Sequence, residues 1–157
     1  MQTIETILVQ HPFFQGMEPR HIQSIAGCAS NFNIDARKYI FHEGEEAALF
    51  YLIQRGRVAL EAHAAERGPI TIETIEAGEV LGWSWLFPPF RWHFSARTVE
   101  PTQGILINGL CLRAKGEADH DLGYELVKRV AQIMMQRLQA TRLQLLDLYA
   151  VGQRGVL

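Results

Sequence analysis

The sequence predicts a mainly β fold: a jelly roll (double-stranded β-helix) with short N-terminal helices and a long C-terminal helix. Three observations predict it. Runs of β-branched and aromatic residues alternate with glycine corners over residues 31–110, a proline-led helical pattern precedes them, and a proline-free amphipathic stretch follows them. The chain of 157 residues can bury the core of one domain, and no linker or repeat divides it. We therefore expect a single domain over residues 1–157.

Residues 1–30 are expected to form short helices. Pro19 favours a helix start, because proline is common in the first helical turn. Apolar residues recur at helical spacing after it, at Ile22, Ile25 and Ala26. The segment His11–Phe14, just before this helix, is predicted as a turn with two apolar anchors.

Residues 31–110 are expected to form the jelly roll. Glycine marks the corners between strands, since only glycine adopts positive φ without steric cost. Regularly spaced short strands of this kind predict an antiparallel sandwich or jelly roll. The predicted strands are Lys38–Phe41, Leu49–Ile53, Val58–Ala62, Ile70–Ile75, Phe94–Val99 and Thr102–Ile107.

Residues 117–149 are expected to form one long amphipathic helix, with Gly123 as its candidate break. Its apolar residues recur at steps of three and four. They are Leu122, Leu126, Val130, Ile133, Met134, Leu138, Leu145 and Leu148. A helix of this length exceeds what one small roll can cover, so part of the apolar stripe is expected to contact another chain. A homodimer through this helix is the first expectation, and a different protein partner is the second.

The composition limits the partners and the compartment. A formal net charge of −2 gives no electrostatic reason to expect nucleic acid or an anionic membrane surface as partner. The N-terminal segment is too polar for a signal peptide and too short for a membrane span. Cys28 and Cys111 show no pattern of a disulfide framework or a zinc cluster, so we expect a soluble protein of the reducing cytoplasm.

No catalytic or metal-binding pattern stands out. The histidines are scattered, without a ligand pair on one helix face, at His11, His21, His42, His63, His93 and His120. Neither a nucleophile elbow nor a phosphate-binding loop of the ATPase type is present. We therefore expect no catalytic residues, no metal site and no enzyme activity.

Three glycine corners carry a family resemblance. The segments Tyr39–Glu45, Leu49–Val58 and Ala77–Gly82 stand in the order and at the spacing of one known domain. The chain resembles the cyclic nucleotide-binding domain of catabolite-activator-type (CRP/FNR) regulators, kinase regulatory subunits and gated channels. The resemblance spans nearly the whole chain. It implies the jelly roll and a ligand site in the cassette, residues 82–97.

The cassette departs from the family pattern at two positions. The resemblance implies a glutamate after Gly82 that holds the ribose, and an arginine before Ser95 that holds the cyclic phosphate. Trp83 and Phe94 stand at these two positions. Because a buried phosphodiester without donors costs several kcal/mol, ordinary cyclic nucleotide binding requires replacements from elsewhere in the chain.

Eight residues of the cassette are candidates for such contacts: Gly82, Trp83, Ser84, Trp85, Arg91, His93, Ser95 and Arg97. A short helix after Gly82 would offer N–H groups of Ser84 and Trp85 to an anion. Ser95 would add a hydroxyl. Arg91, His93 or Arg97 would replace the missing arginine, and on a strand Arg97 shares a face with Ser95. The expected ligand is a cyclic nucleotide or another small anionic or planar molecule, stacked or walled by Trp83 and Trp85.

A second interpretation of the cassette stays open. Its aromatic residues are Trp83, Trp85, Phe87, Phe90, Trp92 and Phe94. These rings would then fill the pocket themselves and replace a ligand.

Two functions therefore compete. The first is a non-catalytic sensor in which ligand contacts at the cassette bias the long helix. The second is a ligand-free module for dimerisation or protein interaction, with an aromatic-filled pocket. Residues 150–157 are too few for a DNA-reading module. A third interpretation, the sensor part of a longer DNA-binding regulator, is also kept.

Overall fold

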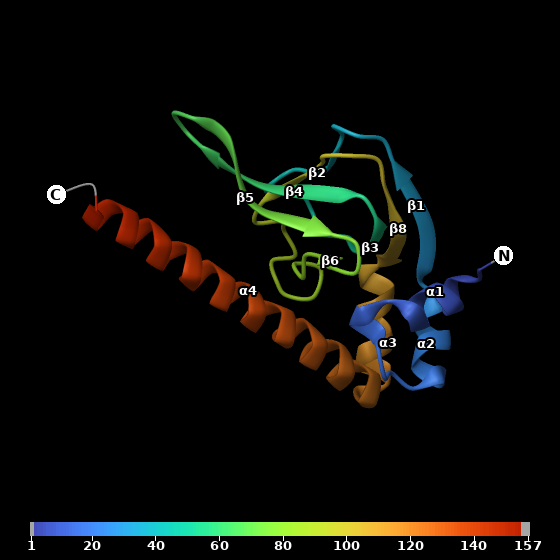
Figure 1. Cartoon of the computed structure of the whole chain (residues 1–157). Coiled ribbons are helices and arrows are strands. Elements are labelled where there is room, and N and C mark those ends of the chain that lie inside the picture. Colours follow the sequence, from blue (N-terminus) through green and yellow to red (C-terminus); the bar gives the residue numbers. More distant parts are fainter. Residues whose placement is uncertain (1, 155–157) are drawn as a thin grey trace.

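Two antiparallel four-stranded sheets form the body of the molecule, and helices gather at its base (Figure 1). The computed structural model describes residues 2–154. The strand order is β1-β8-β3-β6 in one sheet and β2-β7-β4-β5 in the other. The strands are β1 (Ala29–Ile34), β2 (Tyr39–Phe41), β3 (Leu49–Arg55), β4 (Arg57–Ala64), β5 (Gly68–Glu76), β6 (Val80–Leu81), β7 (Ser95–Thr98) and β8 (Thr102–Asn108).

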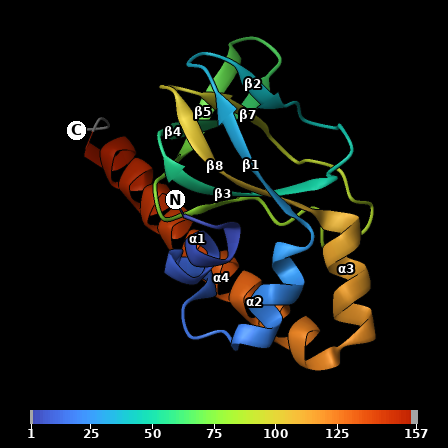
Figure 2. The same ribbon diagram turned by 90° about the vertical axis from the view of Figure 1, so that its right-hand side faces the viewer.

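The helices lie at both ends of the chain. They are α1 (Ile4–Gln10), the 3₁₀ turn η1 (Pro12–Phe14), α2 (Pro19–Ala26), α3 (Gly109–Ala118) and α4 (His120–Arg154). Figure 2 shows α1 and α2 lying across α4 below the sheets, with α3 beside them. The mainly β fold with short N-terminal helices and a long C-terminal helix is confirmed, and every predicted strand coincides with an observed one.

Side-chain alternation along β3 separates two apolar cores. Tyr51 and Ile53 belong to the core between the two sheets, which we call the roll interior. Phe50 and Leu52 point the other way, into the core between the sheet and the helices, which we call the helical core. The short strand β6 does the same, because Leu81 joins the roll interior and Val80 joins the helical core.

The corner between α3 and α4 differs from the prediction. The sequence interpretation left α3 unassigned and placed the break of the long helix near Gly123. In the structure α3 ends at Ala118 and the break falls at Asp119. The long helix α4 begins at His120 and runs to Arg154, rather than over residues 117–149. Gly123 has another role: a Cβ there would lie 2.8 Å from the carbonyl oxygen of Gly116, so the two helices approach too closely for a side chain.

A disulfide joins Cys28 and Cys111, with their Cα atoms 5.9 Å apart. The sequence showed no pattern of a disulfide framework, so this bond was not predicted. The reason for the bond is the pairing of β1 with β8, which sets Ala29 opposite Ile107. Cys28 precedes the first of these strands and Cys111 follows the second, so the ladder brings together two residues 83 positions apart.

The apolar stripe of α4 is divided along its length. Its first part is buried in the helical core, at Leu122, Leu126 and Val130. From residue 138 to residue 152 every residue of the helix is exposed, Leu138 by 63%, and this part of α4 projects from the body of the molecule (Figure 1). The base of the molecule therefore covers only the first half of the predicted stripe.

Candidate functional site

The cassette is a series of turns between β6 and β7. The N–H of Leu86 donates to the carbonyl oxygen of Trp83 at 3.0 Å, and the N–H of Phe90 donates to that of Phe87 at 2.9 Å. No α-helix forms in this segment. The predicted short helix after Gly82 is therefore wrong, and the helical N-terminus proposed as an anion site does not form there.

Trp92 lies in the roll interior. Its side chain is 3% exposed, and its indole stacks on the ring of Phe41 with centroids 3.8 Å apart and an interplanar angle of 5°. The ring of Phe94 lies 6.1 Å away. The backbone of Trp92 is also fixed by two hydrogen bonds. Its carbonyl oxygen accepts from the N–H of Gly44 at 2.8 Å, and its N–H donates to the carbonyl oxygen of Glu45 at 3.0 Å. Both the ring and the main chain of this residue are therefore held in place.

Gly82 lies directly against this indole. It adopts φ +77°, a left-handed conformation that favours glycine. A Cβ at this position would overlap the six-membered ring of Trp92. The glycine predicted to face a ligand thus faces a tryptophan of its own chain.

The wall of the roll interior near Trp92 is apolar in character. Tyr51 contributes to it, with its ring 6.2 Å from that of Phe41. Burial, with a smaller contribution from the charge of Glu45, raises the pKa of Tyr51 to about 12. Because this environment disfavours the phenolate, it also disfavours other anions that bring no partner.

Ser95 and Arg97 lie on the outer face of their sheet. Ala96 between them belongs to the roll interior, so alternation along β7 points both neighbours away from it. The Oγ of Ser95 accepts from the N–H of Glu43 at 2.9 Å. Arg97 pairs with Glu61, Nε to Oε2, at 2.9 Å. The shared strand face of Ser95 and Arg97 is as predicted, but both side chains are engaged outside the roll interior.

Arg97 and Glu61 form part of a small outer network. The carboxylate of Glu61 is 5% exposed and also accepts from the hydroxyl of Tyr39 at 2.9 Å. This hydrogen bond is the main cause of the raised pKa of Tyr39. The network holds β2, β7 and β4 together on the side of the sheet that faces away from Trp92.

The two tryptophans that follow Gly82 face the helices. Trp83 lies under the guanidinium of Arg137 from α4, whose central carbon is 4.8 Å from the ring centroid. Trp85 is fully buried in the helical core, 5.0 Å from the ring of Phe50. These two side chains therefore attach the cassette to the helical side of the molecule, and Ser84 between them is buried.

The remaining candidates lie on the surface. Arg91 and His93 are exposed, and Nη1 of Arg91 donates to the carbonyl oxygen of Gly44 at 3.4 Å. The eight candidates thus occupy the roll interior, the helical side, the outer sheet face and the surface, and they do not converge on one space. Phe41 and Tyr51, which belong to the roll interior together with Trp92, were not among the predicted site residues. The available signal was the alternation of inward and outward side chains along their strands.

Two antiparallel sheets closed by a loop after β6 and followed by a long helix define a β-roll domain of the jelly-roll class. The sequence model of the cyclic nucleotide-binding domain matches residues 32–114, and the chain belongs to this family.

Solved structures agree with this assignment. A putative cyclic nucleotide-binding protein from Geobacter metallireducens is 28% identical with a TM-score of 0.78, covering 88% of this chain and 99% of that one. A cyclic nucleotide-binding domain from Methylobacillus flagellatus is 17% identical with a TM-score of 0.77, covering 92% and 82%. The catabolite activator protein of Thermus thermophilus is 23% identical with a TM-score of 0.69, covering 88% and 63%. The last two show the shared fold. No curated protein matches the chain.

Among residues 2–154, none of the helices has both the length and the apolar character needed to span a bilayer. In the same residues, no three histidine, cysteine, aspartate or glutamate side chains are grouped so that they could hold a metal ion.

Proposed function

We propose that this chain is a non-catalytic regulatory module in which Trp92 takes the place of a cyclic nucleotide. The stacking of Trp92 on Phe41, against the backbone of Gly82, is the observation that carries the proposal. The module then acts through its long helix α4 rather than through a nucleotide in the roll interior. This is the second of the two functions that the sequence left open.

The energetic argument compares the indole with an incoming nucleotide. Truncating a buried tryptophan typically costs about 3–5 kcal/mol. A nucleotide that first had to expel Trp92 would bind about a hundredfold more weakly or worse, since each 1.4 kcal/mol is roughly tenfold. The two anchors that the family resemblance leads us to expect are also replaced, by Trp83 and Phe94. A nucleotide would therefore lose hydration without gaining the usual donors.

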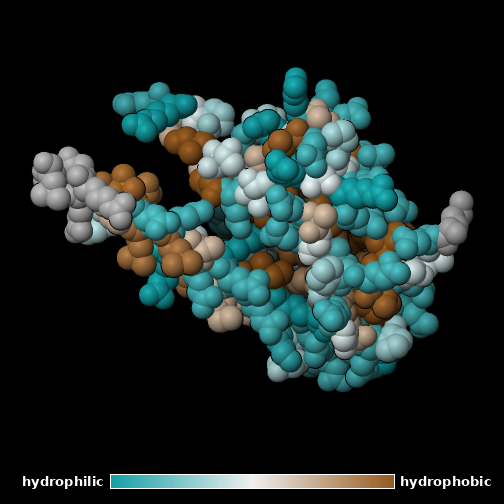
Figure 3. All heavy atoms as spheres, viewed as in Figure 1, coloured by the Kyte–Doolittle hydropathy of each residue, from teal (hydrophilic) through white to brown (hydrophobic). Residues whose placement is uncertain are grey.

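The exposed half of α4 supports dimerisation. Residues at alternating steps of four and three form a heptad seam on it, namely Met134, Leu138, Thr141, Leu145 and Leu148. All five are exposed. Such a seam is the pattern by which two helices pack in a coiled coil. Figure 3 shows apolar surface on this part of α4 and on the β4–β5 hairpin above it, where Ile70 and Ile72 are exposed.

The proposed partner is a second copy of this chain. A heptad seam on one helix is self-complementary, so a two-fold axis lets each copy cover the seam of the other. Neither DNA nor a membrane takes part in the proposed dimer, because a chain with a net charge of −2 has no overall attraction to these anionic partners.

Two measurements test the proposal. The first is isothermal titration calorimetry of the chain with cyclic AMP and cyclic GMP, in which we expect no binding. The second is sedimentation equilibrium of the wild type and of the Leu138→Glu/Leu145→Glu variant, in which we expect a dimer and a monomer. Leu143→Glu changes an equally exposed leucine off the seam and serves as the matched control, which should remain a dimer. Micromolar nucleotide binding, or a wild-type monomer, would overturn the corresponding half of the proposal.

The cytoplasm is the proposed location, and the Cys28–Cys111 pair makes it testable. Cytoplasmic thiols are kept reduced by glutathione and thioredoxin. In the cytoplasm the Cys28–Cys111 bond of the structure would then be held reduced, so alkylation during cell lysis should recover two free thiols. Recovery of the chain with this disulfide formed would place it in an oxidising compartment instead.

A further inference from the structure

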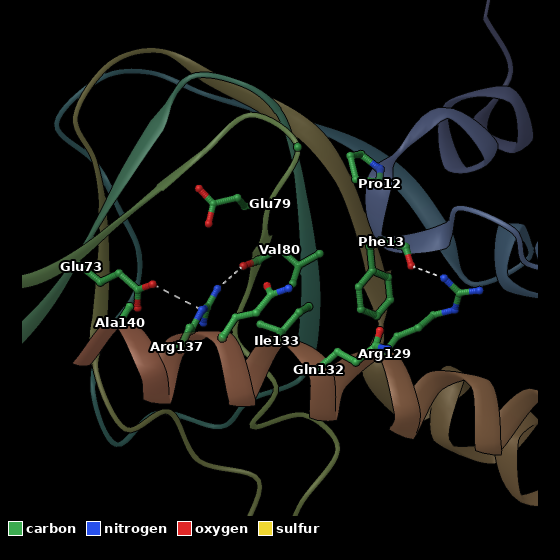
Figure 4. Close-up of a pocket in the computed structure, with 12 residues that line it drawn as sticks. Pro12, Phe13, Glu73, Glu79, Val80, Arg129, Gln132, Ile133, Arg137 and Ala140 are labelled. Atoms are coloured by element: carbon green, nitrogen blue, oxygen red, sulfur yellow. Dashed lines mark hydrogen bonds and ion pairs between the residues drawn. The ribbon is translucent and has the colours of Figure 1, made fainter. Parts of the chain in front are cut away.

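A groove of about 420 Å³ lies where α4 crosses the edge of the roll. Figure 4 shows its walls: η1 on one side, the turn between β5 and β6 above, and α4 below. Its apolar lining includes Phe13, Val80 and Ile133, and its polar lining includes Glu73, Glu79 and Arg137. The volume falls within the range of small-molecule sites.

The groove is separate from the space that Trp92 fills. Val80 lines the groove and belongs to the helical core, whereas Leu81, the next residue, belongs to the roll interior. Because successive side chains of a strand point to opposite faces, the two spaces lie on opposite sides of β6. Occupation of one therefore does not require occupation of the other.

Arg137 brings an unused donor to this groove. Its side chain is 12% exposed, its Nη2 donates to the carbonyl oxygen of Val80 at 2.7 Å, and its Nε lies 3.5 Å from Oε1 of Glu73. Its Nη1 is buried and has no hydrogen-bond partner among the described residues. A buried guanidinium N–H without an acceptor is costly, so this atom favours a ligand that supplies one.

Two carboxylates lie near the same guanidinium. Glu73 and Glu79 both line the groove, and one oxygen of Glu79 accepts from the N–H of Glu76 at 3.1 Å. Burial raises the pKa of Glu73, the charge of Arg137 opposes this, and the charge of Glu79 adds to the rise. A positive group in the groove would therefore be favourable beside these two carboxylates.

The second arginine of the lining is already engaged. Nη1 of Arg129 donates to the carbonyl oxygens of Phe13 at 2.8 Å and Gln15 at 2.9 Å, and its Nη2 lies 3.4 Å from Glu125. Arg129 thus attaches η1 to α4, and its Nε, like Nη1 of Arg137, is buried without a hydrogen-bond partner among the described residues. The other charged side chains of the lining are Arg137, Glu73 and Glu79.

We propose that this groove binds a free α-amino acid with an apolar side chain. Its carboxylate pairs with the guanidinium of Arg137, which shifts slightly so that Nη1 gains an acceptor, and its ammonium lies between Glu73 and Glu79. Its side chain packs along Phe13 and Ile133. A simple anion would face two carboxylates and a simple cation would face the guanidinium, so a zwitterion matches this lining best. Because the groove joins the roll to the middle of α4, such a ligand would also tighten the contact between them.

The test is calorimetric titration of the full chain with three matched probes. L-Leucine carries both charges, L-leucinamide lacks the carboxylate, and 4-methylpentanoate lacks the ammonium. We expect saturable binding of L-leucine and at least tenfold weaker binding of each analogue. Glu79→Gln removes one charge while keeping an acceptor for the N–H of Glu76, and should weaken L-leucine binding. Glu76→Gln changes an exposed neighbour outside the lining and should leave it unchanged.

The outcomes separate this proposal from the function proposed above. If L-leucine, L-methionine and L-phenylalanine all fail to bind, or if an analogue binds as tightly as L-leucine, the zwitterion site is wrong. An unchanged affinity in Glu79→Gln would also overturn it. None of these results bears on Trp92, because that claim is tested with cyclic nucleotides.

Discussion

The indole of Trp92 lies nearly parallel to the ring of Phe41, 3.8 Å between centroids, inside the roll of a cyclic nucleotide-binding domain. The contact joins the cassette to Phe41 of β2, a strand that comes about fifty residues earlier in the chain. Offset or stacked aromatic pairs contribute about 0.5–1.5 kcal/mol beyond the area that they bury. Trp92 is therefore expected to matter for stability as well as for the occupation of the interior.

Replacing Trp92 should measure its contribution to the fold. We expect Trp92→Ala to lower the free energy of unfolding by about 3–5 kcal/mol, because it leaves a cavity in the roll interior. Trp92→Phe keeps an aromatic ring against Phe41 and should cost clearly less. Urea denaturation of both variants provides the measurement. Equal, small effects of the two changes would show that the indole does not fill this space.

Restoring the missing anchors should create nucleotide binding. The variant Trp83→Glu/Trp92→Ala/Phe94→Arg empties the space beside Gly82 and returns a glutamate and an arginine to the positions that the resemblance implies. We expect cyclic AMP to raise the melting temperature of this variant and not that of the wild type, since a ligand stabilises only the state that it binds. The variant Trp83→Glu/Phe94→Arg, which retains Trp92, should show a much smaller shift. An equal shift in both variants would contradict the blocking role of Trp92.

Reduction of the disulfide should destabilise the base of the molecule. Cys28 and Cys111 close a long loop, because they lie 83 positions apart in the sequence. A chain-entropy account gives such a bond about 4 kcal/mol. We expect the double variant Cys28→Ser/Cys111→Ser to melt at a lower temperature and to keep its far-ultraviolet circular dichroism spectrum. The hydrogen bond from Lys115 of α3 to the carbonyl oxygen of Ser24 of α2, at 2.5 Å, still joins this part of the molecule in the variant. Unchanged stability on reduction would show that the bond contributes nothing to the fold.

Acid should weaken the fold through His11. Its ring is buried, Nδ1 accepts from the N–H of Phe13 at 3.2 Å, and Nε2 lies 3.3 Å from the carbonyl oxygen of Ile53. Burial lowers the pKa of His11 below its ordinary value, so the unfolded chain binds a proton more readily. Stability from this group is complete above about pH 6.5 and is lost as the pH falls toward the lowered pKa.

The matched variant for this prediction is His11→Asn, which keeps an acceptor for the N–H of Phe13 and cannot be protonated. Melting temperatures of both proteins between about pH 7.5 and about pH 5.5 provide the measurement. The wild type should lose more stability than the variant over this interval. If the melting temperatures of the two proteins fall equally with pH, His11 does not cause the loss of stability in acid.

The roll and its strands could be predicted because their signals are local. Alternation and glycine corners mark each strand, and Pro19 marks the start of α2. The Cys28–Cys111 bond could not be predicted in this way, because it depends on the β1–β8 ladder, which connects distant parts of the chain. The helix α3 was missed although it carries a local signal, the side chain of Asn108 that caps its first turn.

The altered cassette could be predicted only in part. Trp83 and Phe94 stand at positions that the resemblance fixes, so the loss of two anchors was visible in the sequence. The residue that fills the roll was not, because Trp92 lies in an irregular turn where neither strand nor helix spacing gives a direction. Trp83 and Leu86 pack against the helical core, whereas Phe87 is exposed.

The most direct test of the central claim follows Trp92 alone. In the variant Trp83→Phe/Trp85→Phe it is the remaining tryptophan, and its emission reports the roll interior. We expect blue-shifted fluorescence, weak quenching by acrylamide, and no change on adding cyclic AMP. Emission typical of exposed tryptophan, or a shift produced by the nucleotide, would contradict the account.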